Sequence, residues 1–510
     1  MIGSRILRRK GAHASVYSRH VAPPLRSLFA WSASLSLALG LVGAGCTSTS
    51  PATSTTGDAG ACLGADFPGA PLGVHCGALV DREGRTVLLH GMNARVAGVF
   101  DVTFDDGRAP LEPIPTFTTD DARRLRAIGF NALRLPINWS AIEPKDGGFD
   151  DAYLDRVAAV VETCKSAGLF VLLDLHQDAW SKEIGEDGAP LWAITPAPTT
   201  LLGGPLDDLE ARRLSKQVIA AFETFFGDSP DGLRLRDRYA KMAAHVAMRF
   251  ANDTAVVGLE LFNEPIAVDA TLPGVYAPMI AAVRAAAPAK LIFFEPSSTR
   301  NVLDKSPLGA GSLGPGTVYA PHVYTLAFAG DDTARNNVTK EGLRLSNVSA
   351  REEAESYEAP LVITEFGFDP RQPSFARYVR WQMELEDEMH ASSFYWVWKE
   401  QSQGGWGLYD YDAAGVATER PAVVGALSRV RLEAAAGRIV SVAYDADAKR
   451  FEAHIAGEAG VTAPNVVSLG SATPSRATCD GRAVTLAPGP NDKTVQIACN
   501  GAGDHVLVLE

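Results

Sequence analysis

Short apolar runs recur along the middle of the chain, and each run is bounded by Gly, Pro or charged residues. Segments with a helical spacing of apolar residues, such as 119–128 and 153–167, separate these runs. A parallel strand covered on both faces is apolar along almost its whole length, so each run indicates a buried strand. The runs are residues 86–93, 130–137, 169–175, 256–262, 291–294, 317–323, 361–364 and 393–398. Eight strands alternating with helices predict an α/β fold, a (β/α)8 TIM barrel.

Three long segments follow predicted strands, at residues 94–115, 178–235 and 325–349. In a (β/α)8 barrel such segments lie on the face that carries the active site. The middle segment contains several large apolar residues, namely Trp180, Leu191, Trp192, Ile194, Leu201 and Leu202. These side chains either pack a small core of the segment itself or form an apolar wall beside the cleft. Such a wall would suit a lipid or an aromatic group.

The pattern changes after about residue 436, where short, turn-bounded segments with β propensity replace the alternation of strands and helices. These segments are residues 439–444, 451–455, 466–469, 483–486, 494–498 and 505–509. Regularly spaced short strands predict a small β-sandwich at 436–510, after a barrel at 62–435. No cluster of reactive side chains occurs in this part. A stabilising role and an accessory sugar-binding role both stay open.

The composition is that of an ordinary globular protein, with 46% hydrophobic and 21% charged residues among 510 and a net charge of −13. A nucleic-acid partner requires clustered Lys and Arg, so the acidic balance argues against one. No His, Cys and Asp cluster has metal-ligand spacing, and no Gly-rich phosphate loop follows a strand. We therefore expect no metal and no cofactor, and we expect a monomer.

The first 61 residues are expected to lie outside the fold. Basic residues up to Arg26 precede an uncharged, Leu- and Ala-rich run at 28–45, which predicts an export signal at 1–45; a membrane-spanning helix is the alternative. The run ends in Val-Gly-Ala-Gly-Cys, which resembles a bacterial lipobox and implies lipid attachment at Cys46. Residues 46–61, rich in Thr, Ser, Ala and Gly, predict a flexible tether. The protein is thus expected to be exported, and either secreted or lipid-anchored to a bacterial membrane.

The remaining cysteines fall into two pairs and a single residue. Cys62 and Cys76 flank a short loop before the barrel, and Cys479 and Cys499 lie in two segments that resemble neighbouring strands. In an exported protein both pairs are expected to form disulfides. Cys164 lies inside an apolar helical pattern and is expected to be a buried, inert thiol.

Two of the apolar runs end in a carboxylate followed by Pro or Gly, at Glu264-Pro265 and at Glu365-Phe366-Gly367. The tips of barrel strands form the floor of the active site, so a charge at this place needs a reason. Glycoside hydrolysis requires one protonated and one ionised carboxyl group across the bond that breaks, about 5–5.5 Å apart when the configuration is retained. Each Glu alone could merely end a strand in a salt bridge. Two of them at strand tips make a catalytic pair the better interpretation.

Asn263-Glu264-Pro265 and Thr364-Glu365-Phe366-Gly367 resemble the motifs of the retaining glycoside hydrolases of family 5. The resemblance implies that Glu264, after strand 4, is the acid/base and that Glu365, at strand 7, is the nucleophile. Burial should raise the pKa of Glu264, and hydrogen bonds from Arg134 and Tyr324 should keep Glu365 ionised. The resemblance also implies substrate-binding roles for Arg134, His176, Asn263, His322, Tyr324 and Trp398, with Trp398 as the platform beneath the sugar.

Within family 5 the resemblance is to endoglycoceramidases, which cut the β-linkage between a glycan and ceramide. It rests on Leu-Asp-Leu-His-Gln-Asp-Ala-Trp-Ser at 173–181, Phe-Glu-Pro at 294–296, Trp-Lys-Glu at 398–400 and the segment 404–410. It implies that Asp178 joins His176 in binding sugar hydroxyls and that Lys399 helps to select the sugar. Glu295 also precedes Pro, but its strand does not have the three-strand separation from Glu365, so we expect a structural or substrate-binding role.

Three functions remain open at this point. The first is hydrolysis of a glycosphingolipid or a similar glycoside with an apolar aglycone, which predicts an apolar channel. The second is an endo-β-glucanase or mannanase acting on polysaccharide, which predicts an open groove lined with exposed Trp. The third is a lipoprotein that binds glycans without cutting them, and the intact pair Glu264 and Glu365 counts against it.

Overall fold

The structure is a computed structural model that describes residues 62–307, 309, 311–328, 331–401 and 405–510. The expected export signal, the tether and Cys46 lie outside these residues, and the expectations about them stay predictions. Within the described ranges, no helix combines the length and the apolar character that a membrane span requires.

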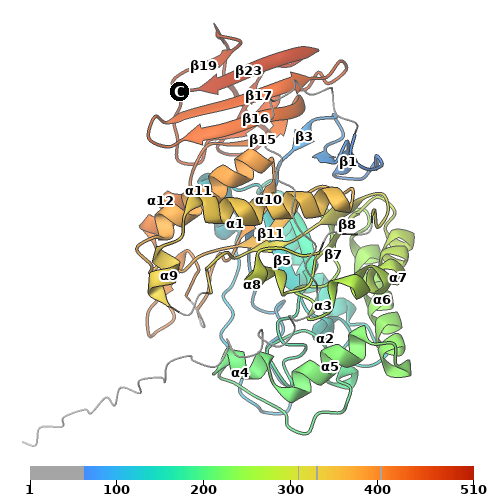
Figure 1. Ribbon diagram of the computed structural model, residues 1–510. Helices are drawn as coiled ribbons and strands as arrows, with labels where there is room; N and C mark the ends of the chain where they lie inside the picture. The colour runs from blue at the N-terminus through green and yellow to red at the C-terminus, as the bar shows by residue number, and fades with distance from the viewer. Residues whose placement is uncertain (1–61, 308, 310, 329–330, 402–404) are drawn as a thin grey trace, which may run out of the picture. The chain divides into compact units, whose positions relative to one another are not determined.

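Parallel strands surrounded by helices form a closed barrel (Figure 1). β12 pairs with β4, and a bridge from Tyr319 to Leu361 closes the ring. β9 and β10 are two parts of one predicted strand, interrupted at Pro321, which has no N–H for the ladder. The strands are β4 (His90–Asn93), β5 (Ala132–Ile137), β6 (Phe170–Leu175), β7 (Val256–Glu260), β8 (Leu291–Phe294), β9 (Thr317–Tyr319), β10 (His322–Val323), β11 (Val362–Phe366) and β12 (Ser392–Tyr395). The predicted (β/α)8 barrel is confirmed.

Helices cover the outside of the barrel and begin at residues that cap their first turn. The side-chain oxygens of Thr118, Ser229 and Thr339 accept backbone N–H groups at the starts of α1, α6 and α10. The long helices are α1 (Thr119–Ile128), α3 (Asp151–Ser166), α6 (Pro230–Phe250), α7 (Leu272–Ala286), α10 (Lys340–Ser356) and α11 (Phe375–Met389). α5 (Lys216–Phe226) is slightly longer than α1, and the shorter helices are α2 (Trp139–Ile142), η1 (Leu191–Ala193), α4 (Leu209–Arg213), η2 (Asp269–Thr271), α8 (Arg300–Leu303), α9 (Asp332–Asn336) and α12 (Pro421–Leu427).

Two further sheets pack against each other through a shared apolar core that includes Leu432, Val467, Phe451, Ile455 and Leu507. This confirms the predicted β-sandwich. One sheet consists of β1 (Gly73–His75), β2 (Ala78–Val80), β3 (Thr86–Val87), β15 (Arg431–Ala435), β18 (Asn465–Ser468), β22 (Thr494–Ile497) and β21 (Ala487–Pro488). The other consists of β16 (Gly437–Asp445), β17 (Arg450–Gly457), β23 (Gly503–Leu509), β19 (Ala477–Cys479) and β20 (Arg482–Ala483), and a separate ribbon joins β13 (Tyr409–Tyr411) to β14 (Ala417–Glu419).

The predicted first strand, residues 86–93, is in fact two strands in different sheets. β3 pairs with β15 of the sandwich, whereas β4 pairs with β5 and β12 of the barrel. Both halves are apolar because both are covered, so the apolar pattern could not separate them. The sandwich consequently includes residues 73–87 and 431–435, which the expected boundaries assigned to the barrel.

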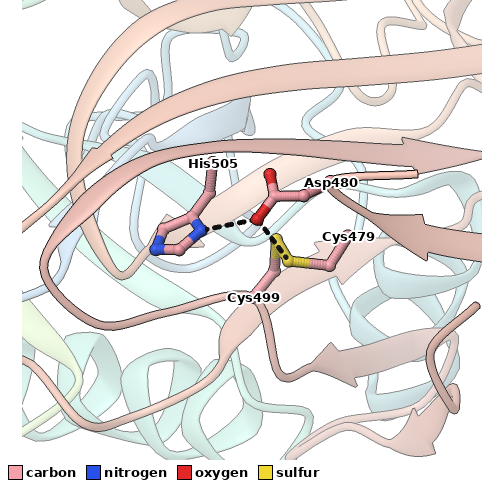
Figure 2. Close-up of side chains that lie close together, drawn as sticks. All are labelled: Cys479, Asp480, Cys499 and His505. Atoms are coloured by element: carbon pink, nitrogen blue, oxygen red, sulfur yellow. Dashed lines mark hydrogen bonds and ion pairs between the residues drawn. A yellow bond between two sulfur atoms is a disulfide. The ribbon is translucent and has the colours of Figure 1, made fainter. Parts of the chain in front are cut away.

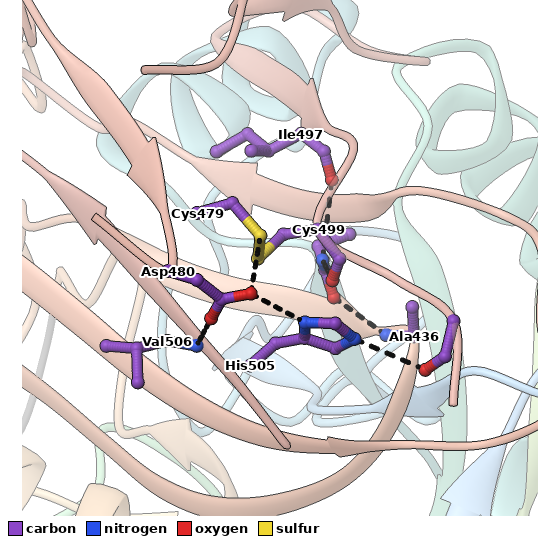
Figure 3. Close-up of a disulfide and its surroundings, with 9 residues drawn as sticks. Ala436, Cys479, Asp480, Ile497, Cys499, His505 and Val506 are labelled. Carbon is purple, nitrogen blue, oxygen red and sulfur yellow. Dashed lines mark hydrogen bonds and ion pairs between the residues drawn. A yellow bond between two sulfur atoms is a disulfide. The ribbon is translucent and has the colours of Figure 1, made fainter. Parts of the chain in front are cut away.

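Both expected disulfides, Cys62–Cys76 and Cys479–Cys499, are present. Figure 2 shows that Asp480 and the His505 ring lie beside the second one, with Oδ2 of Asp480 3.0 Å from Nδ1 of His505. Asp480 also accepts the backbone N–H of Val506 at 2.8 Å, so it ties this disulfide to β23 (Figure 3). Cys164 is a buried free thiol, and burial raises its pKa, as expected for an inert cysteine.

Candidate active site

Glu365 lies in β11, and its carboxylate is held by two hydrogen-bond donors. Arg134 Nη1 donates to Oε1 at 2.6 Å, and the Tyr324 hydroxyl donates to Oε2 at 2.8 Å. The Glu365 side chain is almost fully buried. These contacts are the ones that the sequence predicted. Because both neighbours donate, the arrangement satisfies the ionised form of the carboxylate.

Glu264 follows β7, and Nδ1 of His322 lies near both the Glu264 and the Glu365 carboxylate. Oε1 of Glu264 accepts Asn301 Nδ2 at 2.6 Å and lies 2.8 Å from His322 Nδ1. Its backbone has φ of +45°, an uncommon conformation for a residue with a side chain, and its N–H donates to Glu295 Oε2 at 3.1 Å. His322 also lies 3.6 Å from Glu365 Oε2 and 3.3 Å from Glu295 Oε2. A carboxylate oxygen of Glu264 and one of Glu365 lie within 4.8 Å of each other.

The pKa shifts of these carboxylates differ from those expected from the sequence. Burial raises the pKa of Glu264, but the hydrogen bond and the charge of His322 outweigh burial, so its pKa lies below the ordinary value. Burial likewise raises the pKa of Glu365, and the opposing charges of His322 and Arg134 do not cancel this rise. Burial lowers the pKa of His322, but the charges of Glu295 and Glu365 raise it well above the ordinary value. The expectation of a raised pKa at Glu264 is therefore wrong, and the opposite shifts of the two pKa values favour protonation of His322 over Glu264.

Arg134 forms the floor of the site and is fully buried. Its guanidinium group donates to Glu260 at 2.6 Å, to Asn93 at 3.0 Å and to Asn263 at 2.8 Å, in addition to Glu365. A buried cation with this many acceptors has one stable orientation, which fixes the position of the Glu365 carboxylate. Asn93 and Glu260 had not been predicted as site residues, although both end barrel strands.

His176 and Asp178 lie at the end of β6, as the sequence predicted. His176 Nδ1 lies 2.6 Å from Asp174 Oδ2, and its Nε2 lies 3.3 Å from Asp178 Oδ2. The ring of Trp396 stacks on the His176 ring with centroids 5.9 Å apart. Asn263 is held on both sides, since its Oδ1 accepts Arg134 and its Nδ2 donates to a backbone carbonyl at 2.9 Å. Its expected contact with the sugar stays a prediction.

Residues 81–402 match the family model described as cellulase (glycosyl hydrolase family 5). The chain belongs to glycosyl hydrolase family 5. Endoglycoceramidase I of Rhodococcus hoagii is 33% identical over 316 residues, which are 57% of this chain and 61% of that relative. A glucosylceramidase of Aspergillus fumigatus is 29% identical over 240 residues, 36% of this chain and 31% of the relative. The chain thus matches about three fifths of the first relative's length and a third of the second's.

Solved structures agree with this family membership over a larger part of the fold. Endo-glycoceramidase II from Rhodococcus sp., in its ganglioside GM3 complex, superimposes with a TM-score of 0.71 at 25% identity, covering 85% of this chain and 98% of that chain. The structure of an endogalactoceramidase gives a TM-score of 0.69 at 25% identity, covering 86% of this chain and 99% of that one. Because these chains are covered almost completely, the similarity extends beyond the barrel to the β-sandwich.

The assignment of the family 5 aromatic platform to Trp398 is wrong. Trp398 is fully buried, donates from Nε1 to Asp121 at 3.2 Å and packs on Tyr409. Trp396, two residues earlier, is half-buried and stacks on His176, so it is the indole that borders the site. β12 ends at Tyr395, so the alternation of a strand does not extend to the residues that follow. Both tryptophans satisfy the sequence motif, and only the path of the loop distinguishes them.

Lys399 is not brought to the two carboxylates either. Its ammonium group lies 2.6 Å from Asp121 Oδ1 on α1 and above the ring of Tyr409. The neighbouring Glu400 is buried and accepts Arg95 at 3.2 Å. These contacts tie the segment after β12 to the outer part of the barrel, and a role for Lys399 in sugar selection stays a prediction.

The apolar residues of the 178–235 segment are partly buried and partly exposed. Trp180 is buried among Trp139, Phe222 and Phe225, which supports the interpretation that the 178–235 segment packs its own core. Leu191, Leu201 and Leu214 of this segment are exposed, and exposed apolar side chains also occur on the segments after β7, β8 and β10. We call these residues the apolar rim: Val268, Val302, Leu303, Leu326 and Phe328. Val302 of the rim directly follows Asn301, the residue that donates to Glu264.

Proposed function

We propose that the protein is a retaining β-glycosidase that hydrolyses the bond between a glycan and ceramide, or a similar apolar aglycone. The names of its relatives support this substrate class, since they include endoglycoceramidases and glucosylceramidases. One similar structure is titled a ganglioside GM3 complex, and another is titled a lactosyl-enzyme intermediate.

The observation that carries the proposal is the short distance between two carboxylates at opposite strand tips. Oxygens of Glu264 and Glu365 lie within 4.8 Å of each other. Retaining glycosidases place their two carboxyl groups about 5–5.5 Å apart, whereas inverting enzymes need roughly 6.5–9.5 Å to accommodate a water molecule. The spacing therefore favours attack by a protein carboxylate rather than by water.

The contacts of each carboxylate assign its role. Glu365, held by Arg134 and Tyr324, attacks the anomeric carbon, and the bond to the aglycone oxygen breaks. Glu264 delivers a proton to that oxygen, and His322 at 2.8 Å is the group that supplies this proton to Glu264. Glu264 then takes a proton from water as the water displaces Glu365 from the sugar. The Glu264 side chain is more exposed than that of Glu365, as access to the leaving group and to water requires.

The apolar rim supports a lipid aglycone. The aglycone leaves on the side of the acid/base, and the rim lies on the segments after β7, β8 and β10, in which Asn301 donates to Glu264. The alternative of a polysaccharide hydrolase predicts a groove lined with exposed Trp. In the described part of the chain no Trp is exposed, so no observation favours that alternative.

Export, attachment of lipid to Cys46 and a monomeric state are also proposed, on the sequence alone. Export to a membrane surface suits an enzyme whose substrate is a membrane lipid. Lipid attachment is tested by expressing wild type and Cys46→Ser in a bacterium fed labelled palmitate. Label in wild type and none in the variant is expected, and equal labelling would contradict the anchor.

The function is tested by incubating the enzyme in detergent with glucosylceramide, lactosylceramide, a ganglioside and a soluble β-glucan. Wild type is compared with Glu365→Gln, which keeps the size of the side chain and removes its charge. We expect the intact glycan to be released from ceramide by wild type only. Cleavage of the β-glucan alone would contradict the proposal and support the polysaccharide alternative.

A further inference from the structure

Arg213 reaches the active site from a segment that is not a barrel strand. It is the last residue of α4, in the long segment between β6 and α6 (Figure 1). The preceding Arg212 anchors this helix, because its guanidinium group donates to the backbone carbonyls of Gly185, Gly203 and Pro205. The backbone at Arg213 is thereby held against the segment that follows β6.

The Arg213 side chain is shared between two carboxylates and remains 38% exposed. Nη2 lies 3.3 Å from Asp178 Oδ1 and 2.9 Å from Glu186 Oε2, and Nε donates to the same Glu186 oxygen at 3.0 Å. The other oxygen of Asp178 faces His176. The Asp178 carboxylate therefore lies between His176 and Arg213. The Arg213 side chain beside it is still partly exposed to solvent.

The position of this pair in the barrel places it on the glycan side of the substrate. Asp178 follows β6 and Trp396 follows β12, whereas the apolar rim follows β7, β8 and β10. In the sheet order, β12, β4, β5 and β6 are consecutive strands, so these two residues border the half of the site opposite the rim. If the aglycone leaves over the rim, the glycan lies over this half.

We propose that Arg213 and Asp178 together bind two neighbouring hydroxyl groups of the glycan, with Arg213 as donor and Asp178 as acceptor; this rests on the proposed function. A guanidinium group only donates hydrogen bonds, and an ionised carboxylate only accepts them. Arg213 can therefore donate to one hydroxyl group while Asp178 accepts from its neighbour. The glycan in contact with this pair is a neutral sugar. A carboxylated or sulfated sugar would be repelled by Asp178 and Glu186, which contact the guanidinium group, and by the charge of Glu264.

The electrostatics agree with this geometry. Burial raises the pKa of Asp178, but the charge of Arg213 and the hydrogen bond to His176 keep it below the ordinary value, so Asp178 is an acceptor throughout the working pH range. Burial and the charge of Asp178 raise the pKa of Glu264, whereas His322 and, to a smaller extent, the charge of Arg213 lower it. Loss of the Arg213 charge should thus act on sugar binding and on the protonation of Glu264 together.

The test compares Arg213→Met and Arg213→Lys with wild type, using 4-methylumbelliferyl β-lactoside for kinetics and lactose for calorimetric binding. We expect kcat/KM for Arg213→Met to fall about 10- to 100-fold, mainly through KM, because a hydrogen bond from a charged group is lost in both ground and transition states. The alkaline limb of the pH profile should move to higher pH, since the pKa of Glu264 rises. Arg213→Lys keeps the positive charge, so its alkaline limb should lie at the wild-type pH. Its KM should lie between those of wild type and Arg213→Met.

Arg234→Met is the matched control, because Arg234 is similarly exposed and pairs with Asp146 on the outside of the barrel. The inference would be overturned if a folded Arg213→Met variant had the kinetic constants, pH profile and lactose affinity of wild type. Hydrolysis by wild type would still support the proposed function in that case. A wild type that neither hydrolyses the lactoside nor ceramide glycosides and does not bind lactose would overturn both. Binding of lactose that weakens in Arg213→Met supports the inference whatever the rate of hydrolysis.

Discussion

Nδ1 of His322 lies 2.8 Å from Oε1 of Glu264 and 3.6 Å from Oε2 of Glu365, so one imidazole ring links the two carboxylates. Its third neighbour is the buried Glu295, expected to be structural or substrate-binding, whose Oε2 lies 3.3 Å from Nε2 of the ring. Three acidic neighbours raise the pKa of His322 well above its ordinary value. The raised pKa favours a protonated ring beside Glu264, the proposed acid/base.

The first prediction concerns the nucleophile. An aryl 2-deoxy-2-fluoroglycoside should inactivate the enzyme by forming a stable ester with Glu365, because the fluorine slows the hydrolysis of the glycosyl-enzyme. Mass spectrometry of a proteolytic digest should locate the added mass on the peptide that contains Glu365. Glu365→Gln should remain unlabelled and lose activity by roughly 10⁴-fold or more. Label on the Glu264 peptide instead would reverse the two roles.

The second prediction concerns the proton at His322. In wild type the alkaline limb of kcat/KM reports loss of the proton shared by His322 and Glu264, and His322 holds it with a raised pKa. In His322→Gln the proton must reside on the Glu264 carboxyl group, whose affinity for protons is lower than that of the wild-type imidazole. The alkaline limb should therefore move to lower pH. An alkaline limb at the same pH in both proteins would show that His322 does not hold the catalytic proton.

The third prediction separates the two tryptophans after β12. Trp396→Ala should lower kcat/KM about tenfold with little change in stability, because the half-buried ring borders the sugar. Trp398→Ala should lower the free energy of unfolding by about 3–5 kcal/mol, because it removes a large buried side chain. Denaturant unfolding and steady-state kinetics on the same preparations distinguish these effects. A Trp396→Ala enzyme with wild-type constants would remove Trp396 from the sugar site.

The fourth prediction concerns the apolar rim. Replacing Val302 and Leu303 by Ser should lower the rate on lactosylceramide in mixed micelles about tenfold or more, because apolar contacts with the lipid are lost. The rate on a soluble aryl lactoside should not change. Val440→Ser, an exposed apolar residue of the sandwich strand β16, is the control and should affect neither rate. An equal fall in rate on both substrates would mean that the substitutions disturb the contact of Asn301 with Glu264 rather than contacts with the lipid.

Several features were accessible from the sequence because they are local. A buried strand is a continuous apolar run, so the barrel strands and the two carboxylates at their tips could be located without the fold. The short strands of the sandwich and the two cysteine pairs were identified for the same reason. The contacts of Arg134 and Tyr324 with Glu365 are not local, and they were expected from the resemblance to family 5.

Other features depended on neighbours that are distant in the sequence. The division of residues 86–93 between two sheets is set by which strands pair with each half, and both halves are equally apolar. Trp396 and Trp398 are indistinguishable until the path of the loop after β12 is known. Arg213 and Asn301 come from connecting segments with no periodic pattern, and only the packing of those segments brings their side chains to Asp178 and Glu264.

The sequence by itself determined the fold class, the family and the identity of the two carboxylates, since each is encoded in short runs of adjacent residues. Only the tertiary structure decided the direction in which the pKa of Glu264 is shifted. The sequence predicted a raised pKa for Glu264 from burial, whereas the position of His322 between Glu264, Glu295 and Glu365 lowers it. A pKa depends on every charge within a few ångströms, and those charges come together from strands that are far apart in the chain.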